Sequence, residues 1–362
     1  MFLLGSSRLG VKGGFYGVIA QLGERIDGID EVRGSIPLDS KKEKTPKREK
    51  AGFYRGPLFR GPSDQTECVR RDTKGPMPAQ PRLAFVLNFD AEHELEAGAR
   101  WTAPKTLKAK LDSLAHEMVL PEGAVVVTPE MKLPAGTEGR VWCPTPRALA
   151  TVARAGLIVP ETPSVEIVRQ VNERGFAAQL AEGELEPTFF SQSIEALQAF
   201  IAQPGPTGRW RLKRGLGASG RGQRRVNAGA LSEEEVSWMR RAVIFAPLYV
   251  EPELQLEREV AVYGWARRDR GVELTGVRGQ TTDSRGAFLR CGRIEADTLG
   301  EHKKPMMEAA EKVGVALLQA GYHGPFGIDG YMHRTPQGAL QLRALSEINA
   351  RYCMGWDEKD GF

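Results

Sequence analysis

Three oxygen-bearing side chains near the end of the chain have the types and the spacing of a metal site. Asp329 lies in an apolar run, Phe326–Met332, and Glu347 and Asn349 are two residues apart in a second run, Ala339–Asn349. Alternate residues of a strand share a face, and the polar break between the runs predicts a hairpin that places Asp329 opposite the other two. Two carboxylates and an amide oxygen are hard donors that suit Mg²⁺ or Mn²⁺. Polar residues at solvated strand ends are the alternative.

A second candidate site is a strand-like segment, Trp210–Lys213, that ends in a lysine and runs directly into the glycine-rich segment Gly215–Gly222. The G-x-G-x-x-G spacing is typical of dinucleotide-binding folds, but that fingerprint requires a helix directly after the loop. The residues that follow have a strand-like pattern instead, which predicts a glycine-tipped hairpin. Backbone N–H groups at such a tip can close over phosphates. A flexible hairpin in solvent is the alternative.

Two more segments follow the glycine-rich run, the strand end Tyr249–Leu254 (YVEPEL) and the strand start Glu259–Val262. Between Leu157 and Gly355 the chain resembles the ATP-grasp superfamily. The resemblance lies in the order of four elements: a strand ending in a lysine, a glycine-rich loop, a hinge segment and a late Asp…Glu-x-Asn set. The earlier segment Asn88–Leu95 (NFDAEHEL) is similar to the opening of bacterial ATP-grasp proteins of unassigned substrate. There, His93 and its flanking glutamates either meet the substrate or begin a helix.

The resemblance implies a phosphate-binding role for two cationic side chains and for the glycine loop. Lys213 would contact the phosphates, and Arg174 stands where relatives often have a second lysine, which keeps the charge but changes the geometry. Arg351 matches an arginine that steadies a phosphate or a substrate carboxylate. The loop residues expected to contribute backbone or hydroxyl donors are Gly217, Ser219 and Gly220.

The resemblance also implies a nucleotide hinge and the metal set. Glu251 and Leu254 would offer mainly backbone contacts to adenine, and Glu253 would reach the ribose. Glu259 matches the glutamate of a Gly-x-Glu motif whose glycine is replaced here by Glu257. The metal ligands carried over are Asp329, Glu347 and Asn349.

The implied function is that of an ATP-dependent ligase that joins a carboxylate to an amine or a thiol through an acyl phosphate. Two alternatives stay open: an ATP-grasp kinase for a small molecule, and a nucleotide-binding protein without catalysis. Arg174 and a C-terminus that is short for the family keep the second alternative open. The sequence leaves the carboxylate, the nucleophile and the oligomeric state open.

The elements expected to position these residues form an α/β protein with two domains. Strand and helix alternation predicts a small parallel pre-ATP-grasp domain, residues 77–158, with a helix over Pro146–Ala155 capped by Thr145. A two-subdomain ATP-grasp fold is expected over residues 159–362, divided at 248/249. Its expected elements include the helices Val165–Leu180, Ser193–Ile201 and Lys304–Ala320, and the strands Val243–Val250, Gly271–Gly279 and Ala287–Cys291.

Composition narrows the class of protein. Hydrophobic residues make up 41% of the 362-residue chain, enough for a packed core, and no apolar run approaches the roughly 18 residues of a membrane span. The four cysteines form no C-x-x-C pair, which favours reduced thiols and a cytoplasmic protein over a disulfide framework.

The basic charge is concentrated in the first 76 residues, which hold 15 Lys or Arg against 10 Asp or Glu. We expect residues 1–76 to be a disordered leader. Residues 17–38 resemble the conceptual translation of a transfer-RNA gene, which favours Met77 as the true start. A nucleic-acid-binding arm is the alternative, and it loses its support if translation starts at Met77.

Overall fold

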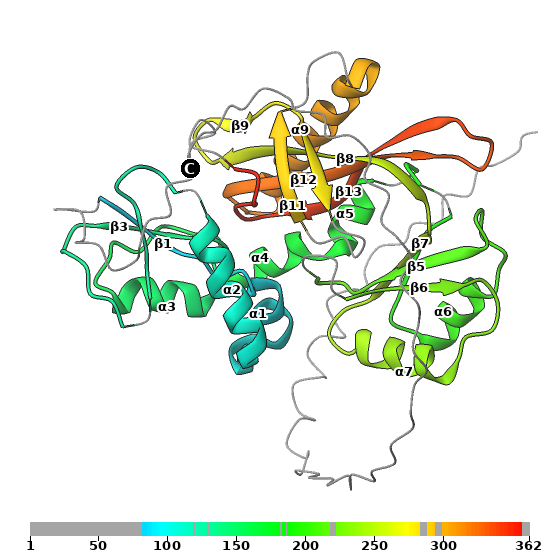
Figure 1. Cartoon of the computed structure of the whole chain (residues 1–362), viewed down its shortest axis with the longest axis horizontal. Coiled ribbons are helices and arrows are strands. Elements are labelled where there is room, and N and C mark those ends of the chain that lie inside the picture. The colour runs from blue at the N-terminus through cyan, green and yellow to red at the C-terminus, as the bar shows by residue number, and fades with distance from the viewer. Residues whose placement is uncertain are drawn as a thin grey trace, which may run out of the picture. The chain divides into compact units, whose positions relative to one another are not determined.

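The structure is a computed structural model that describes residues 82–118, 120–128, 130–181, 183–185, 187–217, 222–282, 288–293 and 299–356. All of them belong to one compact unit, Arg71–Phe362, drawn in colour in Figure 1. The predicted leader, residues 1–76, and the loop residues Ser219 and Gly220 lie outside these ranges. No helix within the described ranges combines the length and the apolar character that crossing a membrane requires.

The first described elements form the expected small parallel α/β layer. Strand β1 (Leu83–Val86) lies between β2 (Val125–Val126) and β3 (Glu138–Val141), and both pairings are parallel. The Thr145 hydroxyl caps α3 by accepting a hydrogen bond from the Ala148 N–H, as predicted. The helices of this region are α1 (Ala91–Ala97), the 3₁₀ turn η2 (Gly98–Arg100), α2 (Lys105–Glu117) and α3 (Pro146–Arg154).

A four-stranded antiparallel sheet carries the predicted phosphate-binding lysine. Its order is β4-β7-β5-β6, and Lys213 at the end of β5 pairs with Gln223 at the start of β6. The glycine-rich segment therefore joins two antiparallel strands, which excludes the dinucleotide-binding arrangement. The strands are β4 (Phe189–Ser191), β5 (Arg209–Lys213), β6 (Gln223–Asn227) and β7 (Leu248–Pro252).

Helices α6 (Ile194–Ile201) and α7 (Glu233–Ala242) contribute to the core of this sheet. The strand predicted over Val243–Val250 is wrong in its first half, because β7 begins only at Leu248. The preceding helix α7 is fixed by a reciprocal capping box between Ser232 and Glu235. Strand β7 spans the predicted subdomain boundary and pairs with β4 and β5.

A six-stranded antiparallel sheet forms the rest of the unit, in the order β11-β10-β8-β12-β13, with β9 also paired to β8. The predicted hairpin is β12 and β13, and the single strand expected over Gly271–Gly279 is instead two strands, β9 and β10. The strands are β8 (Gln255–Arg267), β9 (Gly271–Leu274), β10 (Arg278–Thr282), β11 (Phe288–Arg293), β12 (Gly324–Arg334) and β13 (Leu340–Asn349).

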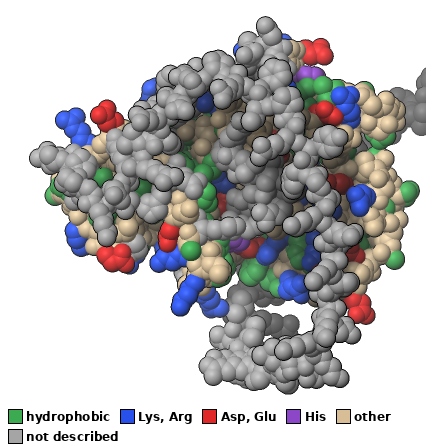
Figure 2. Space-filling view, viewed as in Figure 1, with side chains coloured by type: hydrophobic (Ala, Val, Ile, Leu, Met, Phe, Trp, Pro, Cys, Tyr) green, Lys and Arg blue, Asp and Glu red, His purple; other side chains and the backbone are tan. Residues whose placement is uncertain are grey.

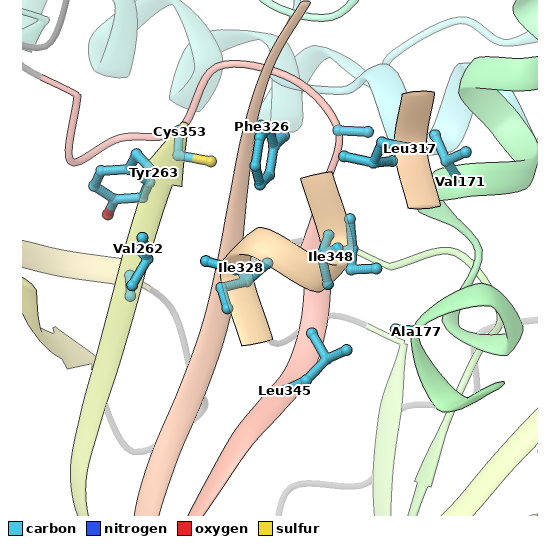
Figure 3. Close-up of a cluster of buried hydrophobic side chains, with 14 of the residues drawn as sticks. Val171, Ala177, Val262, Tyr263, Leu317, Phe326, Ile328, Leu345, Ile348 and Cys353 are labelled. Atoms are coloured by element: carbon cyan, nitrogen blue, oxygen red, sulfur yellow. The ribbon is translucent and has the colours of Figure 1, made fainter. Parts of the chain in front are cut away.

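The largest core lies between this sheet and the helices beside it. Helix α9 (Lys303–Gln319), entered through the 3₁₀ turn η3 (Gly300–His302), packs on β8 and β9. Figure 3 shows side chains from strands and helices meeting in one apolar cluster. The labelled members include Val171, Ala177, Val262, Leu317, Phe326, Ile328, Leu345 and Ile348. Burying these side chains holds the β12–β13 hairpin in register.

The helix predicted over Val165–Leu180 is two helices, α4 (Val165–Asn172) and α5 (Arg174–Leu180). Glu173 between them has extended backbone angles, φ −74° and ψ 135°. The break is stabilised by tertiary hydrogen bonds, because the Arg174 N–H donates to the Gly215 carbonyl at 2.9 Å. It places Arg174 in the first turn of α5, beside the end of β5.

The described surface carries mixed charge. Figure 2 shows Lys and Arg side chains interspersed with Asp and Glu side chains on the visible described face. This agrees with the near balance of charges in the chain after residue 76.

Candidate functional site

The β12–β13 hairpin brings the three predicted metal ligands together. Asp329 and Glu347 are direct cross-strand partners, and Asn349 pairs with Gly327 two positions along the ladder. The Asn349 amide donates to Asp329 Oδ2 at 2.9 Å. The register shifts after Asp329, at Gly330, where a Cβ atom would lie 2.8 Å from the carbonyl oxygens of the facing strand. Glycine at this position therefore permits the close approach that sets the carboxylate pair.

Asp329 lies in a site that disfavours its charge. Burial and the neighbouring Glu347 carboxylate raise the pKa of Asp329 to about 6. Two donors partly offset this, because Gln280 Nε2 on β10 donates to Asp329 Oδ1 at 2.6 Å and Asn349 donates to the other oxygen. A cation placed between the carboxylates would remove the repulsion that raises this pKa.

Glu347 is paired with Arg174. The guanidinium approaches the carboxylate at 3.0 Å and 3.2 Å through its two terminal nitrogens, and its Nε donates to the Arg214 carbonyl at 3.0 Å. Arg174 is buried, with 6% of its surface exposed. The side chain predicted to hold phosphates therefore lies behind Glu347 and fixes that carboxylate in place.

Lys213 and Glu251 form a buried ion pair at 2.5 Å. Burial, opposed by Glu251, lowers the pKa of Lys213 to about 8, with Arg174 and Arg343 adding repulsion. Against the cost of burial, Lys213 and Arg343 hold the pKa of Glu251 at about 2. The Glu251 side chain thus carries charge in the site, whereas the resemblance had implied mainly backbone contacts.

The remaining hinge residues differ in their surroundings. Glu253, predicted to reach a ribose, is held by Arg211 through two hydrogen bonds, 2.6 Å and 2.8 Å, and by Arg225 at 2.9 Å. Leu254 and Glu259 line the same cleft as Lys213. Gly217 is described but does not line the cleft.

Arg351 follows β13 in a bend and is not on the strand itself. Its guanidinium pairs with Glu92 of α1 at 2.5 Å and 2.6 Å, and donates to the Tyr352 carbonyl at 3.1 Å. The segment that was expected either to meet the substrate or to begin a helix does begin helix α1. Through Glu92 it also reaches the site, while the His93 ring packs against Trp101 at 4.7 Å.

One cleft joins most of the predicted residues. Its walls come from β5, β7, β8, β12 and the segment around the end of β13, so both antiparallel sheets contribute. Arg174 contacts Glu347 and Glu253 contacts Arg211, both in the wall of the cleft, but neither Arg174 nor Glu253 lines the cleft itself. The predicted residues that line it are Lys213, Glu251, Leu254, Glu259, Asp329, Glu347, Asn349 and Arg351.

Sequence reasoning missed two side chains that organise this cleft. Gln280 holds Asp329, and Arg343 pairs with Glu251 at 2.6 Å. Arg343 carried a visible signal, since it is a charged residue in the apolar strand Leu340–Asn349 and shares the strand face of Glu347. Gln280 had no such signal, because its partner lies on another strand of the sheet.

The donor set fits magnesium better than a softer metal. Within the described ranges no group of three or more His, Cys, Asp or Glu side chains is arranged to hold a metal ion. Two carboxylates and one amide oxygen leave several coordination positions for water or phosphate oxygens, as Mg²⁺ sites with nucleotides require. The raised pKa of Asp329 indicates a site that gains from a cation.

Asp329→Asn is expected to stabilise the metal-free protein at pH 7.5 and to abolish stabilisation by Mg²⁺. The native pKa of Asp329, about 6, exceeds its ordinary value of 3.8, so the native state binds this proton more tightly than the unfolded chain does. Its contribution to stability is therefore full below pH 3.8 and is lost as the pH rises through 6. We expect a gain of about 1 kcal/mol, or about 2–4 °C in Tm.

Thermal unfolding at pH 5 and pH 7.5, with and without Mg²⁺, checks this prediction. The variant should gain more stability over the wild type at pH 7.5 than at pH 5, because the loss that begins above pH 3.8 is only partly complete at pH 5. The control is Asp269→Asn, which changes an exposed aspartate in the turn between β8 and β9. Equal gains at the two pH values would contradict the assignment.

Comparisons with known proteins gave structural likeness alone. No family model matches the chain, and no curated protein matches it. Among solved structures, N5-carboxyaminoimidazole synthetase from Staphylococcus aureus, complexed with ADP, is 11% identical with a TM-score of 0.44, covering 76% of this chain and 72% of that one.

Two further solved structures are comparably distant. D-alanyl-alanine synthetase A from Vibrio cholerae is 14% identical with a TM-score of 0.46, covering 77% of this chain and 93% of that one. A biotin carboxylase–β,γ-ATP complex from Campylobacter jejuni is 18% identical with a TM-score of 0.42, covering 57% and 46%. Sequence identities and TM-scores this low indicate neither a ligand nor a reaction for this chain.

The structural elements that carry the site occur along the chain in the order predicted from the sequence. A parallel α/β layer comes first, then a lysine-bearing strand, a hinge strand and a carboxylate hairpin, and the last three meet at one cleft between two antiparallel sheets. By the order of its motifs and the topology of its sheets, the chain is ATP-grasp-like.

Proposed function

We propose that the protein binds MgATP in this cleft and is an ATP-dependent ligase that joins a small carboxylate to an amine or a thiol. The observation that carries the proposal is the polarity of the cleft. Lys213 lines it from the four-stranded sheet, and the Asp329–Glu347 pair lines it from the six-stranded sheet. A polyphosphate with its metal ion matches a cation on one wall and carboxylates on the other.

The chain's own residues would mainly bind and orient. Lys213 would contact the phosphates as a point charge, and Arg174 would keep Glu347 in position. Leu254 and the neighbouring backbone of β7 would offer an apolar wall for the base. Asp329, Glu347 and Asn349 would hold Mg²⁺, which supplies charge neutralisation for the phosphate oxygens when bound.

The proposed reaction needs no nucleophilic side chain. A substrate carboxylate oxygen attacks the γ-phosphorus, and ADP leaves with the electron pair of the broken P–O bond. The amine or thiol then attacks the acyl carbon, phosphate leaves, and the nucleophile's proton passes to solvent. Arg351 would orient the acceptor by its charge, for which it has to exchange its contact with Glu92 for one with the substrate. Catalysis here is positioning and electrostatics.

Calorimetric titration of the full chain with ATP, with and without Mg²⁺, tests the proposal. Micromolar binding that depends on Mg²⁺ is the expected result, and ADP release is then measured against pooled carboxylates with and without pooled amines and thiols. Product that needs both pools supports a ligase. A stable phosphorylated product without a nucleophile identifies a kinase, binding without turnover identifies a non-catalytic protein, and no binding by the folded chain overturns the proposal.

A further inference from the structure

We propose that Arg343, which does not line the cleft, is a positioning residue that keeps Lys213 available to an anionic ligand by balancing the Glu251 carboxylate. The inference rests on the proposed function for its ligand, the phosphates of a nucleotide. It assigns a role to a side chain for which neither the sequence motifs nor the ATP-grasp resemblance provides one.

The contacts of Arg343 explain why it is fixed. Its Nη1 lies 2.6 Å from Glu251 Oε2 and donates to the Tyr331 hydroxyl at 3.1 Å. Its Nη2 donates to the Tyr249 hydroxyl at 3.0 Å, and its Nε donates to the Leu345 carbonyl at 3.0 Å. All three guanidinium nitrogens are used, and only 2% of the residue's surface is exposed.

These contacts join the two sheets that form the cleft. Arg343 lies on β13 of the six-stranded sheet, whereas Glu251 and Tyr249 lie on β7 of the four-stranded sheet. The two carboxylate oxygens of Glu251 have different partners: Oε2 contacts Arg343, and Oε1 contacts Lys213 at 2.5 Å. The link therefore connects the metal-site hairpin to the lysine strand through one carboxylate.

The net charge of Lys213, Glu251 and Arg343 determines how strongly Lys213 can attract an anion. One carboxylate between two buried cations leaves a net charge of +1 in the Lys213–Glu251–Arg343 group. Without Arg343, Glu251 would neutralise Lys213 completely and hold it in a closed pair, so that a phosphate would have to compete with a buried carboxylate. With Arg343, Glu251 is already satisfied, and the excess positive charge faces the cleft through Lys213.

The charged groups around Lys213 set the direction of the test. Glu251 on β7 raises the pKa of Lys213, while Arg174 on α5 and Arg343 on β13 lower it. Removing Arg343 should therefore raise the pKa of Lys213 above about 8. A merely structural role for Arg343 predicts no change in this value.

The experiment uses the full chain, its Arg343→Met and Arg343→Lys variants, and the double variant Arg343→Met/Glu251→Gln. The Lys213 side chain is followed by ¹³Cε-lysine NMR without any ligand and assigned with Lys213→Arg. We expect the pKa of Lys213 to rise in Arg343→Met and to stay near the wild-type value in Arg343→Lys. In the double variant it should fall below the wild-type value, because Glu251 is the largest charge that raises it.

MgATP affinity gives the second readout. At pH 7, Arg343→Met should bind about tenfold more weakly, about 1.4 kcal/mol. Measured below the Lys213 pKa found by NMR, the double variant should recover affinity, because its net charge of +1 is then restored on Lys213. Affinity should fall as the pH rises through the pKa of Lys213, and this fall should move to higher pH in Arg343→Met. Arg240→Met, which changes an exposed arginine on α7, is the matched control.

The outcomes separate this inference from the proposed function. An unchanged pKa of Lys213 in folded Arg343→Met overturns the inference, whatever the nucleotide result. If Arg343→Met does not fold, Glu251→Gln is compared with the double variant, and equal pKa values of Lys213 in these two proteins overturn the inference. If the pKa of Lys213 changes as predicted but the folded chain binds no MgATP, the inference about Arg343 is supported and the proposed function is overturned.

Discussion

Lys213→Ala is expected to reduce MgATP affinity by about 100-fold, or about 2.7 kcal/mol. The side chain lies in the wall of the cleft and is the cation nearest to Glu251. Its removal takes away a charge-assisted contact to phosphate and leaves Glu251, with only Arg343 as a partner, facing the ligand's negative charge. Truncating one member of a buried charge pair typically costs about 2–5 kcal/mol. Calorimetric titration with MgATP measures the effect directly.

Adenosine separates the phosphate contact from damage to the whole site. Because adenosine carries no phosphate, its affinity should change less than threefold in Lys213→Ala. Lys108→Ala, which changes an exposed lysine on α2, should bind both ligands as the wild type does. Equal losses for adenosine and MgATP would place Lys213 in the architecture of the cleft and not at the phosphates.

The paired change Glu347→Ala/Asn349→Ala is expected to remove the dependence of nucleotide binding on Mg²⁺. Two of the three oxygen donors are lost, and Arg174 is left without its carboxylate partner. In the wild type, Mg²⁺ should increase ATP affinity by at least about 30-fold, or about 2 kcal/mol. In the variant the affinity should be the same with Mg²⁺ and with EDTA.

A readout without nucleotide keeps this prediction independent of turnover. Mn²⁺ binding, followed by the loss of the free-ion electron paramagnetic resonance signal, should be present in the wild type and absent in the paired variant. Glu308→Gln, which changes an exposed glutamate on α9, is the control. Retention of the Mn²⁺ site in the paired variant would show that other donors hold the ion.

The sequence predicted the parts of the site that depend on local pattern. Alternation within Phe326–Met332 and Ala339–Asn349 was enough to predict a hairpin with Asp329 facing Glu347 and Asn349, because a strand's period of two fixes which side chains share a face. The capped helix after Thr145 and the glycine-tipped hairpin after Lys213 followed from equally local rules.

Local pattern failed where long-range contacts override it. Val165–Leu180 has continuous helical character, yet its backbone breaks at Glu173 because the Arg174 N–H bonds to Gly215 in a distant loop. The strand predicted over Val243–Val250 begins late, because Val243 caps the C-terminus of α7 and the residues after it form a turn before β7 starts at Leu248.

Side-chain partnership was decided by tertiary structure alone. Lys213, Glu251 and Arg351 are visible in the sequence as candidate site residues, but nothing local indicates that Glu251 divides its oxygens between two cations or that Arg351 meets Glu92. These pairs join residues far apart in the chain, and their charges are buried together only when the sheets pack. The sequence by itself determined which groups can do chemistry, and the packing of the two antiparallel sheets decided their charge and their neighbours.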